Sequence, residues 1–132
     1  MLALLFPGQG SQSVGMGRDA AEASPAARAV FETADAVLGL PLSKLCFEGP
    51  DEALLPTEIQ QPAILATSIA WLRALEERGA ALAPVWVAGH SLGEYSALVA
   101  SGALGLEDAL RLVRARGLFM RDAVAPGAGS MA

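Results

Sequence analysis

Cysteine and aromatic residues are scarce in this sequence, and these shortages limit what the protein can be. Cys46 is the only cysteine, so no intrachain disulfide can form, which fits a reducing compartment. It lies in an apolar run, where we expect a small core residue and not a nucleophile. Aromatic residues make up only 5% of the chain, so alanine and leucine must fill most of the interior. Hydrophobic residues nevertheless reach 53%, which favours a packed domain over a disordered chain.

Basic residues are also few, and long apolar runs are missing. Lys and Arg number nine against 14 Asp and Glu, giving a net charge of −5, whereas a nucleic-acid-binding protein usually has a basic patch. No apolar run is long enough to span a bilayer. Residues 1–6 are too short for a signal peptide and no basic residue precedes them. We therefore expect a soluble, cytoplasmic protein that binds neither nucleic acid nor membrane.

Two short apolar runs alternate with longer segments of helical periodicity. Residues 1–6 predict a buried strand, and residues 85–88 predict a second short apolar strand. Helices are predicted from Ser24-Pro25 to Gly39, at 51–55, from Gln61-Pro62 to Gly79, from about Leu92 to Gly102, and from about Leu106 onward. This order predicts an α/β domain with a parallel sheet. Two strands cannot complete such a sheet, so we expect either part of a longer protein or a partner segment.

The segment Gly89-His90-Ser91-Leu92-Gly93 matches the pattern G-x-S-x-G between a predicted strand and a predicted helix. In that context the flanking glycines avoid collisions, the serine sits exposed on a tight turn, and the helix aims its amides at the same point. An oxyanion formed when the serine attacks a carbonyl would be stabilised there. The bare pattern is weak, and the alternative is a glycine-rich strand–helix turn with a capping serine.

A serine nucleophile needs a base, and the sequence offers no evident one. The only histidine, His90, is adjacent to Ser91, and neighbouring side chains on a tight turn usually diverge. We therefore expect a structural or substrate-side role for His90, and an incomplete catalytic set. A second oxyanion donor would come from the glycine-rich loop after the first strand, where the backbone amide of Gln9 is the natural candidate. The alternative is that this loop is only a flexible connection.

Four motifs resemble, in the same order, those of the acyltransferase family that includes malonyl-CoA:acyl-carrier-protein transacylases and the acyltransferase domains of fatty-acid and polyketide synthases. They are residues 6–12 (FPGQGSQ), 61–63 (QPA), 89–95 (GHSLGEY) and 114–120 (RARGLFM). Residues 129–132 (GSMA) resemble the start of the family's small inserted subdomain. The resemblance implies that residues 1–125 are the N-terminal part of an α/β-hydrolase-like acyltransferase subdomain. Residues 126–132 would then begin the inserted subdomain, truncated.

The resemblance also implies a reaction and a set of residue roles. The reaction would transfer a malonyl group from malonyl-CoA to the phosphopantetheine thiol of acyl carrier protein, in fatty-acid biosynthesis, with no metal ion and no cofactor. The family's catalytic histidine lies far downstream of its elbow, and nothing here matches it. The implied roles are acylated nucleophile for Ser91, oxyanion-hole amides for Gln9 and Leu92, malonyl-carboxylate partner for Arg116, and site lining for Gln61, with His90 on the substrate side.

Helical spacing gives partial support to the role that the resemblance implies for Arg116. It places Arg116 at the border of the apolar stripe of the last helix, where a bidentate guanidinium can face a carboxylate. Arg111, Arg114 and Arg121 lie nearby, and a solvated helix face is the alternative for each of the four arginines, Arg116 included. Two other functions stay open. One is a serine esterase or thioesterase that passes the acyl group to water, and the other is a catalytically incomplete fragment that binds acyl-CoA.

Overall fold

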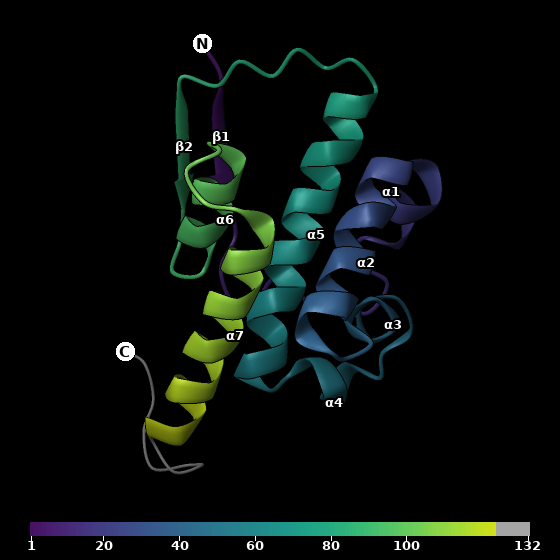
Figure 1. The fold of residues 1–132 in the computed structure, drawn as a ribbon, viewed down its shortest axis with the longest axis vertical. Helices are drawn as coiled ribbons and strands as arrows, with labels where there is room; N and C mark the ends of the chain where they lie inside the picture. Colours follow the sequence, from purple (N-terminus) through teal and green to yellow (C-terminus); the bar gives the residue numbers. More distant parts are fainter. Residues whose placement is uncertain (124–132) are drawn as a thin grey trace.

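The computed structural model describes residues 1–123, in which two parallel strands lie beside a layer of helices (Figure 1). The predicted α/β class with a parallel sheet is therefore confirmed. The predicted start of an inserted subdomain, residues 126–132, lies outside the described residues. In chain order the elements are β1 (Ala3–Phe6), α1 (Arg18–Ala23), α2 (Pro25–Leu38), α3 (Leu42–Glu48), α4 (Asp51–Leu54), α5 (Thr57–Glu77), β2 (Trp86–Gly89), α6 (Gly93–Ala100) and α7 (Leu106–Ala123).

Helix α5 is the centre of the helical layer, with α2 packed on one side and α7 on the other (Figure 1). The apolar residues of the three helices recur at helical spacing, so each helix presents one face to its neighbours. Fully buried side chains at these contacts include those of Phe31, Leu65, Ile69, Leu110 and Val113. Within residues 1–123, no helix combines the length and apolar composition needed to cross a bilayer.

Cys46 is part of this core, as the sequence predicted, since its side chain is fully buried in α3. Burial, together with the nearby charge of Asp35, raises the pKa of the Cys46 thiol to about 12. A thiol with so high a pKa carries almost no thiolate at neutral pH, so it is a poor nucleophile.

The ends of α2 are set by local signals and match the prediction. Ser24 has extended backbone, and its hydroxyl accepts a hydrogen bond from the amide of Ala27 at 3.0 Å, which caps the first turn. Pro25 occupies the first helical position, where a missing amide costs nothing. Gly39 ends the helix with a φ of 64°, a left-handed conformation that glycine adopts without strain, and its amide donates to the carbonyl of Asp35.

The predicted start of α5 is wrong. The helix begins at Thr57, and Pro62 lies inside it instead of opening it. A proline inside a helix leaves the carbonyl four residues earlier without its usual amide donor. That carbonyl belongs to Glu58, and Nη1 of Arg114 on α7 donates to it at 2.6 Å. The helix therefore continues through Pro62 because a distant side chain replaces the lost hydrogen bond.

The two strands form a short parallel ladder that ends at the site. Ala3 lies opposite Trp86 and Phe6 lies opposite Gly89, and the amide of His90 extends the ladder to the carbonyl of Phe6 at 3.2 Å. Helix α6 packs against both strands. The carboxyl ends of both strands and the loops that follow them consequently meet at one edge of the sheet.

The expectation that residues 1–6 form a buried strand is wrong for the described residues. Exposed and half-buried residues alternate along each strand, and the side chains of Leu5 and Trp86 are 78% and 68% exposed. An apolar run is buried throughout only where both faces of its sheet are covered. Residues 1–123 leave the outward-facing side chains of these strands uncovered.

Candidate active site

Ser91 lies on a strained turn between β2 and α6. Its φ of 55° is in the left-handed region, and no other non-glycine residue in the described part of the chain has a positive φ. Such a conformation costs a non-glycine residue on the order of 1–3 kcal/mol and persists only where the surrounding structure holds it. The half-buried serine sits at the carboxyl end of β2, just before the first turn of α6. The sharp strand–turn–helix context predicted around Ser91 is therefore present.

Gly89 and Gly93 make this turn possible because no side chain fits at either position. A Cβ on Gly89 would lie 2.0 Å from the backbone of Gly93, and a Cβ on Gly93 would lie 2.4 Å from the carbonyl oxygen of Phe6. The strands and α6 therefore meet backbone to backbone. A Cβ on Gly8 would lie 2.8 Å from Nδ1 of His90. The loop after β1 thus lies directly against the elbow.

The backbone amides near Ser91 are arranged as at any helix N-terminus, where the first donors lack intrahelical partners. The amide of Gly93 donates to the carbonyl of His90 at 2.9 Å. Within residues 1–123, the amides of Leu92 and Gln9 donate to no backbone carbonyl. An oxyanion hole requires such unpaired amides beside the nucleophile, and the amide of Leu92 belongs to the residue directly after Ser91.

Helix α7 brings Arg116 to Ser91. Nη2 of Arg116 donates to Oγ of Ser91 at 2.9 Å, and Nη1 donates to Oε1 of Gln61 at 2.7 Å. Arg116 is half-buried, at the border of the buried face of α7 as the helical spacing predicted. One guanidinium therefore joins the elbow, α5 and α7. A cation fixed in this position can pair with an anionic group on a molecule held at Ser91.

The Gln61 side chain is fully buried and belongs to a chain of hydrogen bonds. Its Nε2 donates to Oγ1 of Thr57 at 2.8 Å and lies 3.3 Å from Sδ of Met120. Nε2 of Gln9 donates to the same Thr57 hydroxyl at 2.8 Å and to Oε1 of Gln60 at 2.9 Å. The two predicted site glutamines are therefore connected through one hydroxyl that the sequence interpretation did not single out.

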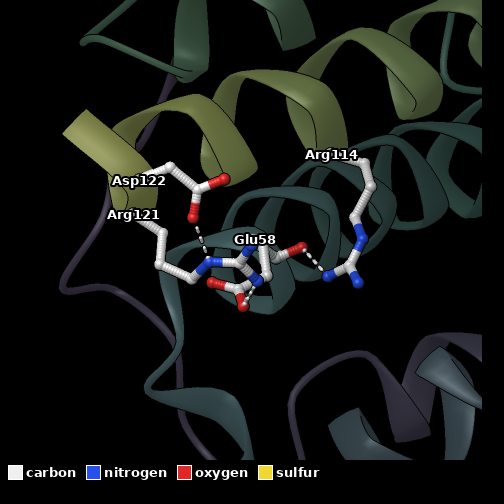
Figure 2. Close-up of polar contacts among 4 residues, drawn as sticks. All are labelled: Glu58, Arg114, Arg121 and Asp122. Atoms are coloured by element: carbon white, nitrogen blue, oxygen red, sulfur yellow. Dashed lines mark hydrogen bonds and ion pairs between the residues drawn. The ribbon is translucent and has the colours of Figure 1, made fainter.

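Glu58 is the residue of α5 to which Arg114 and Arg121 of α7 both bond (Figure 2). Arg114 donates to its carbonyl, as described above, and a Cβ on Gly117 would lie 2.5 Å from the Cα of Glu58. Only a glycine allows α7 to approach α5 this closely. Arg116 is next to Gly117 in the sequence, so the backbone position of Arg116 is fixed by the same contact.

The carboxylate of Glu58 also pairs with α7. Nη1 of Arg121 lies 2.9 Å from its Oε1, and Nε of Arg121 lies 2.8 Å from Oδ1 of Asp122 (Figure 2). Burial alone would raise the pKa of Glu58. The hydrogen bonds from its own amide and from Arg121, with the charges of Arg121 and Arg114, outweigh burial and lower that pKa below its ordinary value. Glu58 is therefore ionised at neutral pH and holds α7 by charge.

The arginines of α7 do not form one patch. Arg111 makes exposed ion pairs with two acidic residues of its own helix, whereas Arg114 and Arg121 bond to α5. Among the arginines of α7, Arg116 is the one that contacts Ser91. Arg116 also lines an open cavity of about 530 Å³, and the other lining residues are Tyr95, Leu112, Ala115, Phe119, Met120 and Ala123.

His90 is exposed, and its ring lies beside the backbone of Gly8. Within residues 1–123 no hydrogen bond joins the imidazole to Ser91. This agrees with the expectation that the two adjacent side chains diverge. The described residues therefore bring together Ser91, Arg116 and Gln61, place Gln9 and Leu92 beside them, and supply no histidine base for Ser91.

Thr57 and Gln60 are the polar residues near the site that sequence reasoning missed. Both lie one turn or less before Gln61 on α5, and Thr57 is four residues before it, a spacing that places two side chains on one helix face. The misplaced start of α5 hid this signal, because the helix was predicted to begin at Gln61.

Comparisons with known proteins agree with this geometry. The sequence profile of the acyl transferase domain family matches residues 3–132. The malonyl CoA-acyl carrier protein transacylase of Bacillus subtilis is 54% identical over 131 residues, which cover 99% of this chain and 41% of that protein. The crystal structure of an acyl-carrier-protein-S-malonyltransferase from Bartonella henselae has a TM-score of 0.89 at 49% identity, over 95% of this chain and 41% of the other.

A further solved relative is a malonyl-transacylase in complex with a type II PKS acyl-carrier protein, with a TM-score of 0.88 at 49% identity. The match covers 93% of this chain and 40% of that one. The described residues define a class of α/β proteins with a serine on a strained strand–helix turn. Within that class, this chain belongs to the acyl transferase domain family. It spans about two fifths of the length of the relatives that it matches, such as 41% of the B. subtilis protein.

Proposed function

We propose that this chain supplies the nucleophile and the carboxylate-binding part of a malonyl-CoA:acyl-carrier-protein transacylase. The observation that carries the proposal is the Arg116 guanidinium, which bonds both to Oγ of Ser91 and to Oε1 of Gln61. A nucleophile paired with a fixed cation suits an acyl group that carries its own negative charge. The relatives described above support the same assignment, because they bear the name malonyl transacylase.

In the proposed reaction, Oγ of Ser91 attacks the thioester carbonyl of malonyl-CoA. The serine proton passes to a general base, coenzyme A leaves as its thiol, and the malonyl group remains as an ester on Oγ. The phosphopantetheine thiol of acyl carrier protein then attacks this ester and restores the serine. The backbone amides of Leu92 and Gln9 would stabilise the oxyanion in both steps.

Arg116 would select the acyl group. Only one methylene separates the malonyl carboxylate from the ester carbonyl, so a guanidinium within 2.9 Å of Oγ is close enough to receive that carboxylate. An acetyl group would leave the guanidinium unpaired, which disfavours it. Gln61 would line the site by holding Arg116, and we assign exposed His90 to the substrate side.

The partner and compartment follow from the same proposal. A relative solved with an acyl-carrier protein supports a carrier protein as the acceptor. Fatty-acid synthesis in the cytoplasm is the setting that we propose, with no membrane attachment. Residues 1–125 would form the N-terminal part of the hydrolase-like subdomain.

A second candidate is an acyl-CoA-binding fragment that does not complete catalysis. It is favoured by one observation: the only histidine of the 132 residues is His90, which is exposed and turned to Gly8. An esterase, which transfers the acyl group to water, would need the same missing base. Its reaction would also give the cation of Arg116 no anionic group to bind.

Intact mass spectrometry of the chain before and after malonyl-CoA tests the proposal, with Ser91→Ala as the matched control. We expect a malonyl adduct on the parent, no adduct on S91A, and loss of the adduct when acyl carrier protein is added. Binding of malonyl-CoA without an adduct would identify the binding fragment. Hydrolysis of simple esters without transfer to the carrier thiol would identify an esterase. An adduct of equal yield on S91A would contradict the role of Ser91.

A further inference from the structure

Thr57 lies between two glutamines of the site, and the proposed reaction gives it no role. Its Oγ1 accepts two hydrogen bonds of 2.8 Å, one from Nε2 of Gln9 and one from Nε2 of Gln61. These glutamines come from the loop after β1 and from α5, so a single hydroxyl connects two segments that are far apart in the sequence. A threonine oxygen has two acceptor positions, and both are used here.

The hydroxyl accepts from the end of the Gln61 amide that does not face Arg116. The Gln61 side chain is fully buried, and its amide can in principle take either of two orientations. With Nε2 on Thr57, Oε1 is left to accept from Nη1 of Arg116 at 2.7 Å. The reverse orientation would place amide hydrogens against guanidinium hydrogens, which is unfavourable in a buried site. An acceptor at Thr57 therefore favours the orientation that holds Arg116.

The same hydroxyl anchors the loop after β1. Nε2 of Gln9 has two hydrogens, and these go to Thr57 and to Oε1 of Gln60. Gln9 follows Gly8, the residue whose backbone lies against His90 at the elbow. Thr57 thus links the position of that loop to the orientation of Gln61, and through Gln61 to the guanidinium beside Ser91.

We propose that Thr57 is a positioning residue for carboxylate recognition: its hydroxyl fixes the amide of Gln61, which holds the guanidinium of Arg116 ready to pair with a carboxylate at Ser91. This inference rests on the proposed function, since it assigns Arg116 to the acyl carboxylate. Thr57 does not touch the substrate itself. Thr57 acts through the orientation of Arg116. A substitution of Thr57 should therefore weaken the binding of a dicarboxylate and leave the overall fold unchanged.

The test compares Thr57→Val, which keeps the shape and removes the hydroxyl, with Thr57→Ser, which keeps the hydroxyl. Malonate and its uncharged diamide, malonamide, are titrated into the parent and both variants of the 132-residue chain, and the side-chain resonances of Arg116 and Gln61 are followed by NMR. We expect T57V to bind malonate roughly tenfold more weakly, the size expected when a buried hydrogen-bonding group loses its partner, and T57S to bind it within about twofold of the parent. Malonamide has no carboxylate for Arg116, so its much weaker binding should change little.

The outcomes separate this inference from the proposed function. Malonate binding by T57V equal to that of the parent would overturn the positioning role. Weakening of malonate binding in T57S as large as that in T57V would also overturn it, and so would a parent that binds no malonate. A parent that binds malonate with the expected contrast between the variants, yet takes no malonyl group from malonyl-CoA, would contradict the transferase and leave the positioning role supported. Matched thermal unfolding curves for the three proteins exclude a general loss of structure as the cause.

Discussion

The middle of α5 and the two strands differ sharply in how their apolar residues are used. From Ala63 to Ala66 the helix is almost completely buried between its neighbours, whereas Leu5 and Trp86 on the strands are 78% and 68% exposed. The candidate site lies where these two regions meet. Ser91 comes from the sheet side, and Arg116 and Gln61 come from the helical side.

This difference indicates how the site is held. On the helical side, Gly117 packs on the backbone of Glu58, and two arginines bond to the same residue, so the position of Arg116 is fixed by several contacts. On the sheet side, Ser91 depends on the backbone contacts of two glycines and on a short ladder. We therefore expect the helical half to be the more stable of the two within this chain.

The largest expected effect is a difference in thiol reactivity between the two regions. Since the pKa of the Cys46 thiol is raised to about 12 by burial, its thiolate fraction at neutral pH is roughly a thousandfold below that of an ordinary thiol. A cysteine at exposed Leu5, introduced as L5C with Cys46→Ala, should therefore react with a disulfide reagent at least that much faster. Similar rates for the two chains would mean that the helical half opens as readily as the sheet.

A methyl group at Gly117 should destabilise the helical half. Its Cβ would lie 2.5 Å from Glu58 Cα, so the two helices must separate, and we expect Gly117→Ala to lower the free energy of unfolding by about 2–3 kcal/mol. This is opposite in sign to the gain of about 1 kcal/mol that alanine gives in a free helix. Urea denaturation measures it. Gly105→Ala is the control, because its Cβ would approach nothing closer than 3.9 Å. Stabilisation by G117A would show that the helices are not in close contact.

Arg114 should be coupled to Pro62. Arg114→Met removes the donor to the Glu58 carbonyl, and we expect a loss of about 1–2 kcal/mol, as for a hydrogen bond from a charged group. In a Pro62→Ala background the new backbone amide can donate to that carbonyl, so the same substitution should cost much less. A double-mutant cycle of unfolding free energies gives the difference. Additive effects would argue against the replacement of a backbone bond by Arg114.

The smallest expected effect is on acid stability. The folded-state pKa of Glu58 is lowered, so the stabilisation that its ionised form provides is present above the ordinary glutamate value of about 4.3 and is lost as the pH falls through the folded value. Arg121→Gln should therefore lower the melting temperature at neutral pH by a few degrees and have less effect under acid conditions. Arg111→Gln, which breaks only exposed ion pairs, should change it less at either pH. Equal effects of the two substitutions at neutral pH would indicate that Glu58 does not hold α7.

The elements that the sequence predicted well are those specified locally. The bounds of α2 follow from Ser24, Pro25 and Gly39, which act on their own helix ends. The start of α5 was missed because proline usually opens a helix, and the contact that lets Pro62 lie inside one comes from Arg114 on another helix. The burial of the strand at residues 1–6 was overpredicted for a related reason, since cover for an apolar strand comes from elsewhere in the fold.

The candidate site also contains residues that a local motif specifies and residues that depend on contacts from distant segments. Ser91 and the glycines beside it were found because the motif is a local device, a tight turn between a strand and a helix. Spacing placed Arg116 at the edge of a buried face but could not choose it over its neighbours, and only the fold shows that it reaches Ser91. Thr57 carries no motif, and its importance is visible only once Gln9 and Gln61 are seen on the same oxygen.

The most direct test is the preference of Ser91 for malonyl-CoA over acetyl-CoA, measured by adduct formation in the parent, in Arg116→Gln and in Arg111→Gln, which breaks only exposed ion pairs. We expect the parent and R111Q to prefer the malonyl donor. R116Q should lose between roughly tenfold and a hundredfold of that preference, the size expected for a charge-assisted pair. An unchanged preference in R116Q, or an equal loss in R111Q, would contradict the proposal that Arg116 recognises the acyl carboxylate.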